Sequence, residues 1–117
     1  MINNIYQDQK GYIWVTTEDG LNKFDGAKFT SYRTHKNDST SLIGNHVYKV
    51  FQDSRGNLYI LSTKGLQIYD YRSDTFKTIK KSSPSYNNKS ITELRNGNIL
   101  IGTSGYGMKT LLSLIHI

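Results

Sequence analysis

Four aspartates recur at matching places in the sequence, and carboxylates are residues that general acid–base catalysis often uses. Asp8 and Asp53 lie 45 residues apart, and Asp25 and Asp70 have the same spacing. All four stand in short polar stretches with turn-forming neighbours, where an aspartate side chain accepts hydrogen bonds from turn amides. We therefore interpret these aspartates as structural turn residues and predict no catalytic residue in the chain.

A second acidic pair, Glu18 and Asp19, lies in one loop and has no acidic equivalent 45 residues later. Without a partner base or ion, we expect this pair to form a solvated loop. A propeller-type glycan-active enzyme, such as a hydrolase or lyase, would need a non-repeating pair of acids about 5–10 Å apart in a central channel. That class of enzyme stays open as one alternative function.

Metal chemistry and thiol chemistry find little support in the sequence. The chain has no cysteine, which excludes thiolate metal sites and cysteine nucleophiles. The histidines His35, His46 and His116 lack a metal-ligand spacing such as i, i+4. We expect no metal site and no cofactor.

Asn45 and His46 are the candidate ligand-binding residues. They stand together where a polar connection enters the presumed innermost strand of a repeat. Polar groups at that place, near the mouth of a central channel, could meet the hydroxyl groups of a sugar. The alternative interpretation is a partly exposed, polar strand start without a ligand.

The net charge is positive, with 15 Lys and Arg against 9 Asp and Glu, a formal charge of +6. Such a charge attracts anionic partners in general. Only Lys77, Lys80 and Lys81 form a cluster, and no nucleic-acid motif accompanies it. We expect no nucleic-acid binding by this segment. A plain protein-interaction module, whose positive surface meets an acidic partner, is the second alternative.

The elements that position these residues come from an internal repeat. The sequence QDQKGYIWV at residues 7–15 returns as QDSRGNLYI at residues 52–60, and the offset of 45 continues without a gap to Asp25 and Asp70. A looser third copy at residues 96–103 follows at an offset of 41. Periods of 40–50 residues are typical of propeller blades, kelch arrays and helical solenoids.

Within the second copy, the hydrophobic pattern indicates strands. Residues 47–51, 66–69 and 75–79 alternate apolar and polar side chains, and residues 58–61 form a continuous apolar run. Polar turn residues separate the segments, and four short strands make one blade. We predict an all-β fold, a partial β-propeller of about two and a half four-stranded antiparallel blades.

The predicted boundaries are blade 1 at about 2–33, blade 2 at about 46–80, a partial blade 3 at about 90–108, and a tail at 109–117 that departs from the repeat template. Each blade has apolar faces that only neighbouring blades can cover, and propellers close with 4–8 blades. We therefore expect a larger parent protein to supply the remaining blades. We also expect the isolated chain to be marginally stable and prone to associate.

Residues 8–25, DQKGYIWVTTEDGLNKFD, resemble the two-component regulator propeller repeat, D-x-x-G-x-[IL]-W-[IV]-G-T-x-x-G-L-x-x-[YF]-D. Residues 37–47, NDSTSLIGNHV, are similar to the linker that leads into the next blade of that family. Thr16 and Leu61 stand where the family usually has glycine, and Tyr59 replaces the tryptophan. The resemblance covers residues 2 to about 108.

This resemblance implies a non-catalytic segment of a sensor. In the family, such repeats form paired propellers in the periplasmic sensor region of hybrid two-component histidine kinases, which are inner-membrane proteins best known in gut Bacteroidetes. The family responds to oligosaccharides from complex glycans, so the implied ligand is an oligosaccharide, and a homodimer of the parent is compatible with it. No stretch resembles a signal peptide, so the location rests on the resemblance alone.

Overall fold

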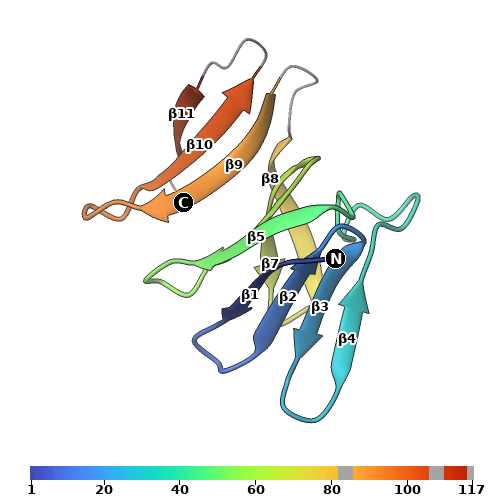
Figure 1. Cartoon of the computed structure of the whole chain (residues 1–117). Helices are drawn as coiled ribbons and strands as arrows, with labels where there is room; N and C mark the ends of the chain where they lie inside the picture. Colours follow the sequence, from blue (N-terminus) through green and yellow to red (C-terminus); the bar gives the residue numbers. More distant parts are fainter. Residues whose placement is uncertain (82–85, 106–109, 116–117) are drawn as a thin grey trace.

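The computed structural model describes the backbone of residues 1–81, 86–105 and 110–115, and the side chains of residues 1–81 and 90–102 (Figure 1). All regular structure in these residues is β-strand. The strands are β1 Ile2–Gln7, β2 Ile13–Thr17, β3 Gly20–Phe24, β4 Phe29–Tyr32, β5 Val47–Gln52, β6 Leu58–Ser62, β7 Gly65–Asp70, β8 Thr75–Lys81, β9 Tyr86–Glu93, β10 Ile99–Gly105 and β11 Thr110–Ile115. Among the described residues, no helix has the length and apolar character to cross a membrane.

The strands form three antiparallel sheets in chain order. The first sheet runs β1-β2-β3-β4, the second β5-β6-β7-β8, and the third β11-β10-β9. Strand β5 contacts β1 and β2 of the first sheet and β9 of the third, so the second sheet lies between the other two (Figure 1). The prediction of an all-β fold with four-stranded antiparallel sheets is confirmed.

Three turns, one in each sheet, share the same backbone geometry. In each turn a glycine N–H donates to the carbonyl oxygen three residues earlier: Gly11 to Asp8, Gly56 to Asp53, and Gly97 to Leu94, at 3.0, 3.1 and 2.9 Å. The φ angles of these glycines are 88°, 90° and 88°, in the left-handed region that favours glycine. The third copy keeps this turn although Leu94 replaces the acidic residue, so the backbone shape does not require the carboxylate.

Two hydrophobic cores lie between the three sheets, one at each interface. The core between the first and second sheets contains Trp14, Leu21, Leu42, Val47, Val50, Leu58, Ile60, Tyr69 and Phe76. The core between the second and third sheets contains Tyr59, Leu61, Leu66, Ile91, Ile99 and Ile101. Every residue of β6 is buried, as predicted for its continuous apolar run, because neighbouring strand residues point to opposite faces and both faces are covered.

Both interfaces use the same repeat positions. In the second sheet, Val50, Leu58 and Ile60 face the first sheet. In the third sheet, Ile91, Ile99 and Ile101, each 41 residues later, face the second sheet in the same way. At both described interfaces, therefore, each sheet uses the same face to pack against the sheet that precedes it in the chain. The preceding sheet contributes its other face.

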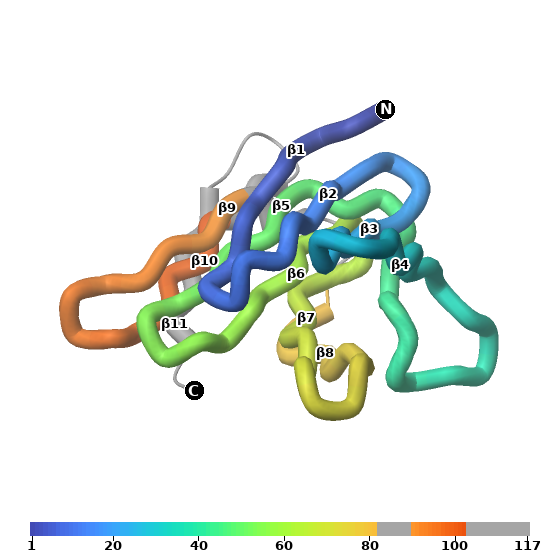
Figure 2. The backbone as a smooth tube through the Cα atoms, turned by 90° about the horizontal axis from the view of Figure 1, so that it is seen from below, coloured from blue at the N-terminus to red at the C-terminus, as the bar shows by residue number. Residues whose placement is uncertain are grey.

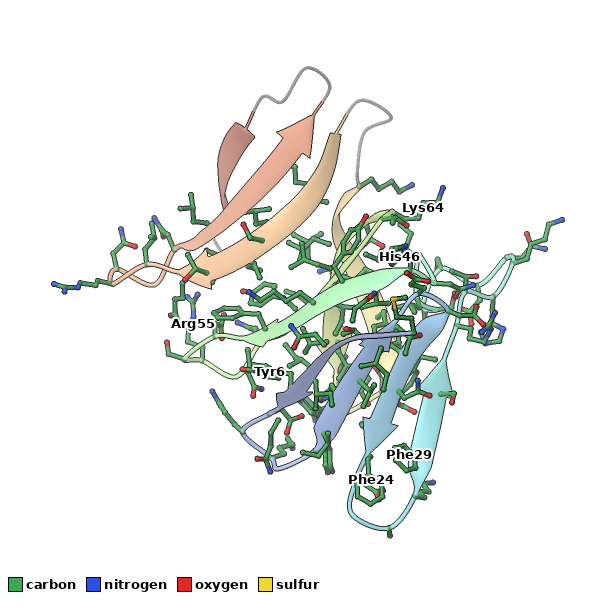
Figure 3. All side chains as sticks on the ribbon, viewed as in Figure 1. Tyr6, Phe24, Phe29, His46, Arg55 and Lys64 are labelled. Atoms are coloured by element: carbon green, nitrogen blue, oxygen red, sulfur yellow. The ribbon has the colours of Figure 1, made fainter. Side chains whose placement is uncertain are left out.

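The matching face of the first sheet is open. Its equivalent residues, 45 positions earlier, are Ile5, Ile13 and Val15, and the register pairs Ile5 with Val15 on a single face. Ile5 is 61% exposed. Phe24 and Phe29 lie together beside the β3–β4 turn of the first sheet, with ring centroids 4.6 Å apart (Figure 3).

The tail beyond the repeat template contains a strand. Residues 110–115 form β11, which pairs antiparallel with β10 from Ser104 opposite Thr110 to Ile99 opposite Ile115. Strand β11 therefore takes the place beside β10 that β7 takes beside β6. The remaining tail residues 109, 116 and 117 lie outside the described part of the chain.

Candidate functional site

Asn45 and His46 lie at one end of the sheets, which we call the loop face. The loop face consists of the connection 33–46 and the turns 17–20 and 62–65, and the connection extends well beyond the strand ends (Figure 2). His46 and Lys64 lie at this end of the second sheet, whereas Arg55 lies at the opposite end (Figure 3). Both candidate residues are half-buried.

Asn45 holds the connection against the first sheet. Its side-chain Oδ1 accepts a hydrogen bond from the backbone N–H of Thr34 at 2.7 Å. Its carbonyl oxygen accepts another from the N–H of Gly20 at 2.5 Å. The Oδ1 atom of the side chain is thus used within the protein.

His46 holds the connection against the second sheet through its backbone, because its carbonyl oxygen accepts a hydrogen bond from Thr63 N–H at 3.0 Å. Its imidazole lies beside the ring of Tyr48, with centroids 4.8 Å apart and planes tilted by 54°. Flat rings beside polar N–H groups are suited to a sugar ring, which has apolar faces and hydroxyl edges. The ligand-binding role of both residues stays a prediction.

Asp19, one of the two acids in the loop without a repeat equivalent, faces a cation. Its Oδ1 lies 2.7 Å from Nη2 of Arg33, and Arg33 Nη1 also donates to the Asp19 carbonyl oxygen at 2.9 Å. The hydrogen bond from Arg33 lowers the pKa of the Asp19 carboxyl group. Asp19 is thus exposed and paired with an arginine in a solvated loop, which counts against the enzyme alternative.

The buried carboxylate of Asp8 is structural. Its Oδ1 accepts the backbone N–H groups of Lys10 and Tyr12 at 3.0 and 2.9 Å. Its Oδ2 accepts Trp14 Nε1–H at 2.8 Å and the Tyr71 hydroxyl at 2.6 Å. Four donors surround the carboxylate, so its function is to hold the turn, the strand and the next blade together.

Asp53 repeats this arrangement in the second sheet. Its Oδ1 accepts the N–H groups of Arg55 and Asn57, and its Oδ2 accepts Asn57 Nδ2 and the Tyr59 hydroxyl, all at 2.9–3.0 Å. Burial opposes ionisation of Asp53, but these hydrogen bonds outweigh it and lower its pKa. Tyr59 can replace tryptophan because its hydroxyl reaches the same carboxylate oxygen as the indole N–H of Trp14.

The other two recurring aspartates also bond to turn amides. Asp25 Oδ1 accepts the N–H groups of Ala27 and Lys28, both at 2.9 Å. Asp70 Oδ1 accepts the N–H of Arg72 at 2.9 Å. The geometry therefore agrees with the structural interpretation of all four positions. Across the residues that the structure describes, no group of His, Asp and Glu could hold a metal ion.

An open groove of about 1200 Å³ lies where the sequence predicted no site, between residues 34–43 and strands β7 and β8. The connection is held over these strands by the hydrogen bond from Phe76 N–H to the Thr40 carbonyl at 2.8 Å. Gln67 adds two more, accepting from Ile43 N–H at 2.9 Å and donating to the Ser41 carbonyl at 3.2 Å. No local pattern predicts the groove, since it exists only where the connection folds back on the next blade.

Comparison with known protein families supports the repeat assignment. The family model described as two component regulator propeller matches residues 1–19 and 41–64. A curated relative, histidine kinase P4 from Formosa agariphila, is 56% identical over 39 residues, which are 33% of this chain and 3% of that protein. The predicted resemblance to these repeats is confirmed.

Solved structures show the same fold. The extracellular domain of the hybrid two component system BT3049 from B. thetaiotaomicron is 23% identical, with a TM-score of 0.68 over 96% of this chain and 15% of that one. The extracellular domain of BT4673 from the same organism is 22% identical, with a TM-score of 0.72 over 100% and 17%. Virginiamycin B lyase from Staphylococcus aureus is 18% identical, with a TM-score of 0.65 over 99% and 42%.

These relatives are much longer than this chain, which spans only 15% and 17% of the two extracellular domains. At such identities the likeness is one of fold, and it includes both extracellular domains of two component systems and a lyase. The predicted partial β-propeller is confirmed.

Proposed function

We propose that this chain, which carries two-component regulator propeller repeats, is part of the ligand-sensing propeller of a hybrid two-component sensor histidine kinase. Its place is the periplasmic part of an inner-membrane protein, and its ligand is an oligosaccharide. Two similar structures are extracellular domains of hybrid two component systems and a third relative is a histidine kinase, which supports the class of protein. The proposed place of binding is the loop face.

The proposal of a larger propeller rests on a hydrogen bond that repeats from blade to blade. Gln9 N–H donates to Gln52 Oε1 at 2.6 Å, and Ser54 N–H donates to Glu93 Oε1 at 2.8 Å. Both donors hold the same repeat position, and so do both acceptors. The acceptor position of the first sheet is Gln7, which is exposed.

Gln7 lies on the open face of the first sheet, beside Ile5 and Ile13. A blade that packed there would bury these aliphatic side chains and bring a turn N–H to Gln7, as the two described interfaces do. The proposed partner for this face is therefore a preceding blade of the parent protein.

The proposal of an oligosaccharide ligand rests on one observation at the loop face. The half-buried His46 ring lies against Tyr48, and the preceding residue, Asn45, carries a polar Nδ2 group. The backbone of both residues is fixed, because their carbonyl oxygens accept hydrogen bonds from the N–H groups of two neighbouring turns. Such a rigid polar site loses little conformational entropy on binding. In the parent, the ligand would bias the kinase by binding one packing of the sensor more tightly than another.

The test is titration of the isotopically labelled chain with neutral and uronic acid oligosaccharides, followed by NMR. We expect saturable shifts at the loop face, and His46→Ala should weaken binding about tenfold, as loss of one good polar contact does. Ser39→Ala, in the same connection but without a role in this site, is the control. Equal affinity of the His46→Ala variant and the unmodified chain would exclude the proposed site.

A protein-interaction module is the second candidate, and the formal charge of +6 favours it. That function requires binding to an acidic protein that weakens as salt screens the charges. If the chain binds an acidic protein in a salt-sensitive manner and no oligosaccharide shifts its NMR signals, the protein-interaction function replaces the proposed glycan sensor.

A further inference from the structure

Lys23 of β3 extends into the interface between the first and second sheets, where four aromatic rings surround its ammonium group. The distances from Nζ to the ring centroids are 5.2 Å for Tyr12, 5.9 Å for Trp14, 5.8 Å for Tyr32 and 5.4 Å for Tyr69. The side chain is only 15% exposed. Ammonium groups are attracted to the faces of aromatic rings within about 6 Å, so each of the four distances is within range.

An anion completes the surroundings of Lys23. Nζ donates to the Tyr69 hydroxyl at 3.1 Å and lies 3.8 Å from Asp74 Oδ1. The same Asp74 oxygen accepts the hydroxyl groups of Tyr32 and Tyr69, both at 2.5 Å. Burial opposes ionisation of Asp74, but the two tyrosine hydrogen bonds and the charge of Lys23 outweigh it and lower its pKa.

The backbone at Asp74 is also unusual. Its φ angle is 57°, in the left-handed region that residues other than glycine seldom adopt. The turn between β7 and β8 thus holds this carboxylate over the interface in a conformation that most side chains avoid.

This cluster is not a product of the repeat. The positions 45 residues after Tyr12, Trp14 and Lys23 hold Asn57, Tyr59 and Ile68, and the position 45 residues before Asp74 holds Phe29. Among the side chains that the structure describes between the second and third sheets, Ile68 packs against an apolar core. The residue types that form this cluster are therefore not copied with the repeat.

We propose that Tyr12, Trp14, Tyr32 and Tyr69, with Asp74, form a binding cage for a primary alkylammonium group, and that Lys23 is its resident occupant. The ammonium group comes from the first sheet, whereas Tyr69 and Asp74 come from the second. Occupancy of the cage therefore joins the outer half of blade 1 to the β7–β8 turn of blade 2. This site is separate from the loop face and does not depend on an oligosaccharide ligand.

The first experiment empties the cage and offers a replacement. Lys23→Ala removes three methylene groups and the ammonium group, which together match n-propylammonium. We expect the variant to unfold at a lower temperature, by about 5 °C or more. Added n-propylammonium should raise its unfolding temperature saturably, while 1-propanol, which has the same length but no charge, should not.

Lys36→Ala, which removes an exposed lysine from the connection, is the matched control and should not respond to n-propylammonium. If a folded Lys23→Ala variant responds equally to n-propylammonium and 1-propanol, or to neither, the cage is refuted.

The second experiment needs no change to the native cage and decides the question if Lys23→Ala does not fold. In the NMR spectrum of the unmodified chain, the ε-methylene protons of Lys23 should be shifted upfield of those of the other lysines, because they lie over ring faces. The spectrum of Lys23→Arg assigns them by their disappearance. Lys23 ε-methylene protons at the position of an exposed lysine would overturn the proposal.

Discussion

At the scale of the residue, Asp8 and Asp53 show how one carboxylate can hold a turn and the side chains around it in place. Each is buried and accepts four hydrogen bonds, two from turn amides and two from side chains. Around Asp8 these donors come from two blades, since Tyr71 lies in the β7–β8 turn of the second blade. The burial and the hydrogen bond to Asp8 raise the pKa of the Tyr71 hydroxyl.

We expect Asp8→Asn to destabilise the chain by about 1–3 kcal/mol, because an amide Nδ2 would face the buried Trp14 Nε1–H and leave that donor without an acceptor. The measurement is the free energy of unfolding from urea titration followed by fluorescence of the single tryptophan. Asp25→Asn is the control, since its exposed side chain keeps an oxygen for the turn amides and should change stability little. Equal effects of both variants would contradict the structural role of Asp8.

At the scale of the element, the β6–β7 turn brings Gly65 against the edge of the outer strand. Its φ angle is 149°, and a Cβ atom there would collide with the carbonyl oxygen of Lys80 and lie 2.9 Å from the Cα of Lys81. Gly20 meets the Tyr32 carbonyl oxygen in the same way in the first sheet. Both turns thus require a glycine for two reasons. The backbone angle is positive, and the neighbouring strand, β8 for Gly65 and β4 for Gly20, approaches too closely for a Cβ atom.

Gly65→Ala should therefore destabilise the second sheet by about 2 kcal/mol or more, since the clash adds to the backbone strain. Gly26→Ala is the matched control, because Gly26 also has a positive φ of 100° but nothing lies within 4 Å of a Cβ atom there. Thermal unfolding of both variants measures the difference. A loss no greater for Gly65→Ala than for Gly26→Ala would show that β8 moves away at little cost.

At the scale of the whole molecule, the three sheets act as successive layers whose interfaces repeat. Each described interface joins apolar side chains and adds one turn N–H that donates to a Gln or Glu of the next sheet. The first sheet presents the same kind of face without a neighbouring blade, with Ile5 61% and Phe29 66% exposed. Exposed apolar patches of this kind promote association.

We expect the isolated chain to associate in solution in a concentration-dependent manner. Ile5→Lys should shift it toward monomer, because a charge on the open face disfavours the burial of that face. Analytical ultracentrifugation over a range of concentrations measures the shift. Ser39→Lys adds the same charge in the exposed connection and should leave association unchanged; a monomeric unmodified chain with a sharp two-state melt would contradict the expectation.

Much of this architecture could be predicted from the sequence, because the relevant information is local. Alternation in residues 47–51 and the apolar run in 58–61 report which faces are buried, and the 45-residue offset shows that the unit is copied. Glycines such as Gly11 and Gly56 report turns through the backbone angles they permit. The place of Asn45 and His46 at a strand entrance followed from the same pattern.

The sequence by itself thus determined the strands, the turns and the copying of the blade, since each depends on neighbours along the chain. Only the tertiary structure decided which distant side chains meet: Lys23 with Tyr69 and Asp74, and residues 34–43 with the outer strands of the next blade. It also decided that residues 110–115 add a third strand to the last sheet. The reason is physical, because contacts between residues 40 or more positions apart depend on how the sheets stack and twist, which no local pattern of residues encodes.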